Sequence, residues 1–159
     1  MRKRKINPQY LKSILSQDVR DGEISALDFA ISLKKFADDY LGGIIEFKVE
    51  GSSTGCVRLK LPVATYLIRL LCECGDYDDL IQATLSIGED ITLKVDYEKR
   101  CPTDDVAYIV KVAKLAGFRV ERDGNSLIFK AEITLTSIMR IYAISTESFY
   151  DMLVLTYKM

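Results

Sequence analysis

Histidine is absent from all 159 residues of the chain. Without an imidazole, the protein has no Ser-His-Asp or Cys-His arrangement for nucleophilic catalysis and no histidine ligand for a metal ion. It also lacks the one side chain whose unperturbed pKa makes it a proton carrier near neutral pH. Most of the common catalytic arrangements are therefore excluded.

The chain also lacks an excess of charge of either sign, because it has 22 basic and 23 acidic residues. No overall field draws it to nucleic acid or to an anionic membrane. The only basic run covers residues 1–5, and a solvated terminus is a better interpretation of it than a contact with phosphate. Residues 6–9 are not the apolar stretch of a signal peptide, and no segment approaches the roughly 20 apolar residues that span a bilayer. We therefore expect a cytoplasmic protein with neither a nucleic-acid nor a membrane partner.

Four cysteines are present, and no two of them have the C-x-x-C spacing of a zinc site. Cys72 and Cys74 are two residues apart, which on a helix places them about 200° apart, facing different ways. In a reducing compartment we expect the cysteines to be buried thiols rather than disulfides. The sequence thus predicts no metal site and no cofactor.

Capping residues and apolar spacing predict two helices in the first quarter of the chain. The first covers residues 8–20 and has Asn7 as its cap. The second covers residues 25–41, and its Ser25 and Asp28 have the spacing of a capping box. Two glycines follow and end it.

Three predicted β-hairpins then alternate with helices. Because helices between antiparallel hairpins place the sheet on one side and the helices on the other, the predicted fold class is α+β. We expect an N-terminal helical hairpin over residues 6–42, a two-layer α/β sandwich over 43–135 and a C-terminal extension over 136–159. The expected elements are hairpins over 45–61, 81–95 and 118–133, helices over 62–74 and 103–116, a strand or helix over 137–144, and a helix over 146–157.

Two stretches resemble parts of one protein family. Ile6-Asn7-Pro8-Gln9-Tyr10-Leu11 resembles the Ile-Asn-Pro-His-Phe-Leu box that opens the dimerising hairpin in the autolysin-regulator type of sensor histidine kinases. Residues 43–133 are similar in element order to the ATP-binding domain that these kinases share with gyrase and heat-shock chaperones. Leu61-Pro62-Val63 resembles the start of the helix that carries the family's magnesium-binding asparagine. The resemblance implies a histidine-kinase ATPase fold.

The residues that this family uses for catalysis are missing. Gln9 stands at the position of the phosphoacceptor histidine, and its amide is not nucleophilic enough to accept a phosphoryl group. The only asparagines, Asn7 and Asn125, lie outside the helix that should hold magnesium, where we expect Glu73 to be a surface charge. Residues 89–116 contain no glycine, although the family has glycine-rich turns there that approach ATP. The resemblance therefore implies a pseudokinase-like protein without catalytic residues.

The first two helices carry more apolar surface than one short hairpin can hide. We expect them to pair with a second copy in a four-helix bundle, whereas the alternative is that they pack on the sandwich of their own chain. The resemblance further implies a response regulator, a kinase or a sigma factor as a partner. The expected dimer interface consists of Tyr10, Leu11, Ile14, Leu15, Phe29, Leu33, Phe36 and Tyr40.

Carboxylates are the basis of the alternative functions. Asp76, Asp78 and Asp79 in a turn, and Asp104-Asp105 at a helix start, could bind a cation or act as acid and base, although acidic residues are ordinary at such positions. An enzyme of unknown chemistry or a phosphotransfer-type scaffold is the alternative function. Asp96 is in the place of the family's adenine-reading aspartate, but without the surrounding glycines a solvated strand end is the better interpretation.

Overall fold

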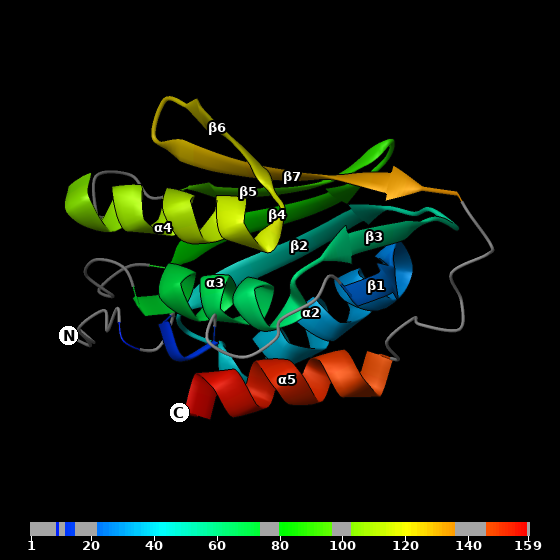
Figure 1. Ribbon diagram of the computed structural model, residues 1–159, viewed down its shortest axis with the longest axis horizontal. Coiled ribbons are helices and arrows are strands. Elements are labelled where there is room, and N and C mark those ends of the chain that lie inside the picture. The colour runs from blue at the N-terminus through cyan, green and yellow to red at the C-terminus, as the bar shows by residue number, and fades with distance from the viewer. Residues whose placement is uncertain are drawn as a thin grey trace.

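A computed structural model describes Gln9 and residues 12–14, 22–73, 80–96, 103–135 and 146–158. Figure 1 shows its helices and strands; along the chain, single helices alternate with one or two strands. They are β1 (Gly22–Ser25), α2 (Ala26–Tyr40), β2 (Ile45–Gly51), β3 (Cys56–Leu59), α3 (Leu61–Glu73), β4 (Ile81–Ile87), β5 (Asp90–Asp96), α4 (Thr103–Ala116), β6 (Arg119–Asp123), β7 (Ser126–Thr134) and α5 (Thr146–Lys158).

The strands form one mixed sheet in the order β1-β3-β7-β5-β4-β2, with β6 also paired to β7. β2 and β4 run parallel, and the other pairs run antiparallel. Buried residues alternate along β4, β5 and β7, so one face of the sheet carries the core and the other carries polar side chains. Figure 1 shows α5 beside α2 and α3, at the opposite end of the molecule from β6 and β7. The predicted α+β class is confirmed.

Much of the local structure agrees with the sequence patterns. The hairpin expected over 81–95 is β4–β5, and the helix expected over 103–116 is α4. The hairpin expected over 118–133 is β6–β7, and the helix expected over 146–157 is α5. The buried helix expected over 62–74 is α3. Ser25 caps α2, since its side chain accepts a hydrogen bond from the Asp28 N–H at 2.9 Å.

The predicted hairpin over residues 45–61 is wrong, because β2 and β3 do not pair with each other. β2 ends the sheet beside β4, whereas β3 lies between β1 and β7. Gly51 at the end of β2 and Gly55 just before β3 lie where the chain passes from one strand to the other. Gly51, at φ 80°, lies directly against the Ile87 carbonyl of β4, and Gly55 lies directly against Ile133 of β7. A Cβ at either position would collide with these neighbours, so each glycine permits a close approach to a different strand.

The predicted helical hairpin over residues 6–42 is also wrong for the part that the structure describes. Residues 22–25 form β1, which pairs with β3 and so joins the sheet. The buried face of α2 packs against α5, and α2 also contacts β2. Residues 22–42 therefore belong to the sandwich, and no domain boundary separates them from residue 43.

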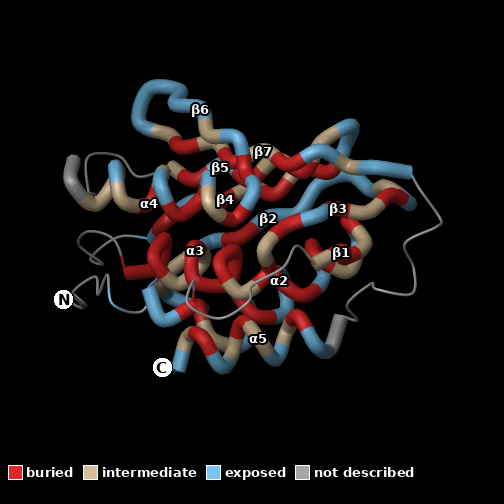
Figure 2. Tube along the Cα trace, in the orientation of Figure 1, coloured by how far each residue is buried: buried red, intermediate tan, exposed pale blue. Residues whose placement is uncertain are grey.

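The C-terminal helix α5 contributes apolar side chains to the same core. Phe149 and Leu153 of α5 are 0% and 1% exposed. The Phe149 ring stacks on Phe29 of α2 with a centroid distance of 5.1 Å, and the Tyr157 ring meets Phe36 edge-on at 5.6 Å. Figure 2 shows buried positions on the inner side of α5 and exposed positions on its outer side. Residues 146–158, expected only as part of an extension, are thus integral to the fold.

Polar contacts also hold α5 in place. The Thr156 carbonyl accepts a hydrogen bond from Arg69 Nη1 of α3 at 3.0 Å, and its hydroxyl lies 3.1 Å from that of Thr65. On the other side, the Tyr150 hydroxyl donates to Asp39 Oδ2 of α2 at 2.7 Å. This hydrogen bond raises the pKa of Tyr150 to about 12, because the protonated hydroxyl is the donor. α5 is therefore attached to two helices by hydrogen bonds as well as by rings.

Truncating the ring at the centre of this contact should weaken the whole fold. We expect Phe149→Ala to lower the free energy of unfolding by about 3–5 kcal/mol, as the loss of a buried phenyl ring does. Urea denaturation followed by circular dichroism measures the change. Leu155→Ala, on the exposed side of the same helix, is the control and should stay within about 0.5 kcal/mol of the wild type. Equal stability of the two variants would show that α5 is not part of the core.

Candidate functional site

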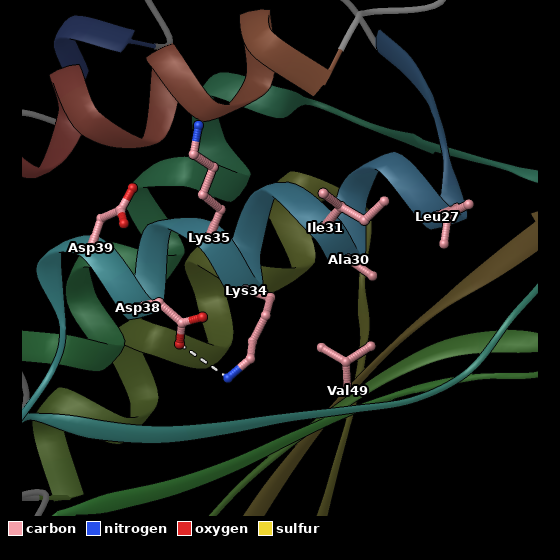
Figure 3. Close-up of a pocket in the computed structure, with 8 residues that line it drawn as sticks. All are labelled: Leu27, Ala30, Ile31, Lys34, Lys35, Asp38, Asp39 and Val49. Atoms are coloured by element: carbon pink, nitrogen blue, oxygen red, sulfur yellow. Dashed lines mark hydrogen bonds and ion pairs between the residues drawn. The ribbon is translucent and has the colours of Figure 1, made fainter.

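An apolar groove lies between α2 and the edge strand β2 (Figure 3). Its volume is about 440 Å³. Leu27 and Ile31 of α2 and Val49 of β2 are 47%, 46% and 37% exposed. Leu27 and Ile31 are four residues apart and so share one side of α2, roughly opposite Phe29 and Phe36, which pack on α5. Three large apolar side chains thus remain in contact with solvent at one place.

The charged side chains at the rim of this groove are paired within the chain. Lys34 Nζ lies 3.0 Å from Asp38 Oδ1 and also donates to the Phe47 carbonyl at 3.1 Å. Asp39 accepts the hydrogen bond from Tyr150, and Lys35 Nζ lies 4.5 Å from the centre of the Tyr150 ring. Because each rim charge has a partner nearby, the groove presents apolar surface without an excess of either charge. Such a surface suits a protein partner better than a charged small molecule.

The helix α3, where the family resemblance implies a magnesium ligand, presents no accessible carboxylate among its described side chains. Glu73 was expected to be a surface charge, and this is wrong because its side chain is only 6% exposed. Glu73 Oε1 lies 2.8 Å from Arg69 Nε one turn earlier in α3, and the same guanidinium reaches Thr156 of α5. Glu73 is therefore paired within α3 with the arginine whose hydrogen bond to Thr156 joins α3 to α5.

The surroundings of α3 are closely packed as well. The Tyr66 and Tyr108 hydroxyls lie 3.2 Å apart and join α3 to α4, and burial raises the pKa of Tyr66 above its ordinary value. A cavity under α2 and α3, lined by apolar residues of the sheet, measures about 20 Å³, which is room for about one water molecule. Asp96 at the end of β5 accepts a hydrogen bond from Ser126 of β7. The Asp96 carboxylate thus links β5 to β7 by a side-chain hydrogen bond at the end of the strand.

Most of the described residues of the expected dimer interface lie inside the chain's own core. Ile14, Phe29, Leu33 and Phe36 are buried, and Tyr40 is half-buried against Phe36 and Tyr157. These described residues therefore pack within one chain, as in the alternative, and do not form a face that is open to a second copy. α5 supplies the cover that the sequence pattern assigned to a second copy. Tyr10, Leu11 and Leu15 lie outside the described residues, and Gln9 is exposed in a helical segment.

The other expected sites are only partly covered by the described residues. Asp76, Asp78 and Asp79 lie outside them, as do Cys74 and Cys101. Of the two described cysteines, both free thiols, Cys72 is buried as expected and Cys56 is only half-buried. Among the described side chains, no three acidic or cysteine residues come together as a metal site would need. Within the described part of the chain, no helix is both long enough and apolar enough to cross a bilayer.

Sequence reasoning missed the groove itself. Its signal is the pair Leu27 and Ile31, two large apolar residues one turn apart that lie on the opposite side of the second helix from Phe29 and Phe36. Whether they lie near Val49 depends on where β2 lies in the sheet. The prediction that β2 pairs with β3 in a hairpin placed β2 elsewhere, so this proximity was not expected.

Comparison with known proteins gives a similarity of fold only. Neither a protein-family model nor a curated protein matches the sequence. Among solved structures, Acinetobacter baumannii histidine kinase AdeS is 12% identical, with 81% of this chain and 75% of that chain covered and a TM-score of 0.46. The cytoplasmic segment of histidine kinase QseC is 14% identical, with 81% and 96% covered and a TM-score of 0.45. The catalytic domain of histidine kinase ThkA is 14% identical, with 72% and 96% covered and a TM-score of 0.43.

A charge at Leu33 should unfold the protein instead of separating two folded copies. Leu33 is only 2% exposed, and an uncompensated buried charge costs on the order of 3–5 kcal/mol. We expect Leu33→Glu to lose its cooperative thermal transition, whereas Leu27→Glu on the exposed side of α2 should keep it. Differential scanning calorimetry of both variants makes the comparison. A folded, monomeric Leu33→Glu protein would restore the interface expected from the sequence.

Breaking the ion pair of α3 should destabilise the contact with α5. We expect Arg69→Ala to cost about 3–5 kcal/mol of unfolding free energy, because it leaves the buried Glu73 carboxylate uncompensated. The double variant Arg69→Met, Glu73→Leu removes both charges and should recover most of this loss. Urea titrations of the two proteins test the expectation. If Arg69→Ala is as stable as the wild type, the Glu73 carboxylate is hydrated and the ion pair does not stabilise the fold.

Proposed function

We propose that this chain is a non-catalytic, histidine-kinase-like regulatory protein that acts in cytoplasmic signalling by binding other proteins. The observation that carries the proposal is the groove between α2 and β2. It exposes Leu27, Ile31 and Val49 together, and the charges around it are already paired. Contiguous exposed apolar side chains of this kind are typical of protein interaction sites.

The chemistry of the chain supports a role without catalysis. No histidine is present to carry a phosphoryl group, and Gln9 occupies the position where the resemblance places the phosphoacceptor histidine. α3 contains no asparagine, and its Glu73 is held by Arg69. Magnesium at a nucleotide needs accessible oxygen ligands, which this helix does not offer. A role in binding needs none of these groups.

A second copy of the chain is one proposed partner, and a response regulator, a kinase or a sigma factor is a proposed partner in signalling. For all of these, the recognised feature would be an apolar surface with few unpaired charges. A phosphotransfer scaffold and a carboxylate enzyme would each use charged residues that are available to a ligand, whereas the charged residues at the rim of the groove are engaged with partners in the chain.

The proposal is tested most directly with ATP. We expect isothermal calorimetry with magnesium and ATP to show no saturable heat up to millimolar nucleotide, because α3 lacks an accessible metal ligand. An active histidine kinase catalytic domain in the same buffer is the positive control. A micromolar dissociation constant for this chain would overturn the non-catalytic assignment.

A further inference from the structure

β2 is the last strand of the sheet, and one of its two edges remains available. The Ile81 N–H donates to the Ile44 carbonyl at 2.9 Å, so the even-numbered residues of β2 direct their backbone groups toward β4. The odd-numbered residues direct theirs outward. On this outer edge the Ile45 N–H is already bonded to the Leu41 carbonyl at 3.0 Å, and the Phe47 carbonyl is bonded to Lys34. Within the described part of the chain, the outward N–H and C=O of Val49 have no partner.

The same residue also lines the groove. Figure 3 shows the Val49 side chain pointing from β2 toward the side of α2 that carries Ala30 and Ile31. The free backbone edge and the exposed apolar side chains are therefore parts of one surface, which we call the β2 edge surface: Leu27, Ile31 and Val49, with the outer backbone edge of β2.

We propose that a second copy of this chain binds the β2 edge surface by antiparallel pairing of β2 with β2, centred on Val49. The pairing continues the sheet from one copy into the other and covers both grooves. It rests on the proposed binding function and specifies the surface and the partner. Its two-fold symmetry makes each copy present the same residues to the other.

The hydrogen bonds already present favour this centre. In an antiparallel pair, residues that face each other exchange N–H and C=O groups, so outward-facing residues must lie opposite each other. Centring on Val49 places its two unoccupied groups opposite those of Val49 in the second copy. Centring on Phe47 would instead place the Phe47 carbonyl, which already accepts from Lys34, at the centre, and would pair Val49 with Ile45, whose N–H is already bonded. Centring on Val49 uses Phe47 only in the flanking pair with Gly51 and leaves the Ile45 N–H out of the central pairs.

The charges on the open face of β2 favour the same register. Glu46, Lys48 and Glu50 alternate in sign along this face and are exposed. Centring on Val49 places Lys48 opposite Glu50 of the second copy, twice by symmetry. Centring on Lys48 would place the two Lys48 side chains opposite each other and Glu46 opposite Glu50. Like charges directly opposite in a sheet are destabilising, whereas opposite charges stabilise the pair.

The groove also fits a second copy better than a charged ligand. Its rim charges are paired within the chain, so they neither attract nor repel a partner strongly. An identical copy brings its own Leu27 and Ile31 to the same edge, and these apolar side chains can fill the groove volume. The interface then buries apolar side chains between two sheets that continue into each other.

Charge exchange across the strand tests the register. We expect the wild type to be a dimer by light scattering and analytical ultracentrifugation. Lys48→Glu and Glu50→Lys should each raise the dissociation constant roughly tenfold or more, because each replaces two attractive pairs by repulsive ones. Mixed together, the two variants should form a heterodimer of near wild-type affinity, since every pair is again of opposite sign. A mixture that stays as weak as the separate variants would overturn the proposed register.

Two further variants separate this surface from others. Glu46→Lys changes the charge on the same face by as much as Glu50→Lys, but in the proposed register it faces no charged residue, so the dimer should persist. Val49→Pro removes the central outward N–H and should give a folded monomer, because proline is tolerated where the N–H of an edge strand faces away from the sheet. Circular dichroism verifies that both variants fold.

Three results would overturn the pairing: a monomeric wild type, a Val49→Pro variant that remains dimeric, or a Glu46→Lys variant as weak as Glu50→Lys. Each is distinct from a failure of the proposed function, which calorimetry with ATP detects whatever the oligomeric state. A monomer that binds no ATP would overturn the pairing alone.

Discussion

The packing of α5 on α2 and α3 is the contact on which the rest of the structure depends. α2 has a wide apolar surface, and the rings of Phe149 and Tyr157 determine which part of it is buried. Phe29 and Phe36 are seven residues apart and so lie on one side of the helix, facing α5. Leu27 and Ile31 are consequently left on the flank beside β2, where they remain exposed. The groove is thus a consequence of how a helix more than 100 residues later in the chain is attached.

The same helix restricts what α3 can do. α3 is apolar along most of its length and lies between α4 and α5, so its few polar side chains must find partners inside the protein. Arg69 serves Glu73 and Thr156 together, and Tyr66 lies against Tyr108. A helix that holds a nucleotide has to leave oxygen ligands accessible, whereas here they are used to join helices. Within its described residues, α3 thus directs its polar groups to the neighbouring helices and presents no accessible carboxylate.

Local patterns in the sequence were sufficient wherever neighbours in the chain are also neighbours in space. The hairpins β4–β5 and β6–β7 are joined by short turns at Gly88 and Gly124, so alternation and turn residues together identified both strands and their pairing. Alternation along residues 45–51 likewise identified a half-buried strand, but it contains no information on which strand lies beside it. β1 is four residues long, too short for its period to be recognised. For α2, spacing revealed an apolar face, yet the same face can be covered by another chain or by a distant helix of its own. The distinction between a dimer interface and a core is therefore a question of tertiary structure that the helix pattern leaves open.

The edge strand β2 shows how a surface can be protected and selective at once. An edge with unpaired backbone groups beside apolar side chains would bind many extended segments, and proteins usually prevent this with charged residues on the strand. β2 carries such residues, but their signs alternate, so they oppose most registers and favour few. The bonds from Leu41 and Lys34 close part of the same edge and leave the backbone groups of Val49 accessible. The charge pattern and the occupied hydrogen bonds thus both limit the registers in which another strand can pair with β2, and both favour pairing at Val49. A strand that combines both restrictions next to exposed Leu27 and Ile31 has the features expected of a site for one specific protein partner. A strand that aggregates non-specifically would need neither the alternating charges nor the occupied backbone groups.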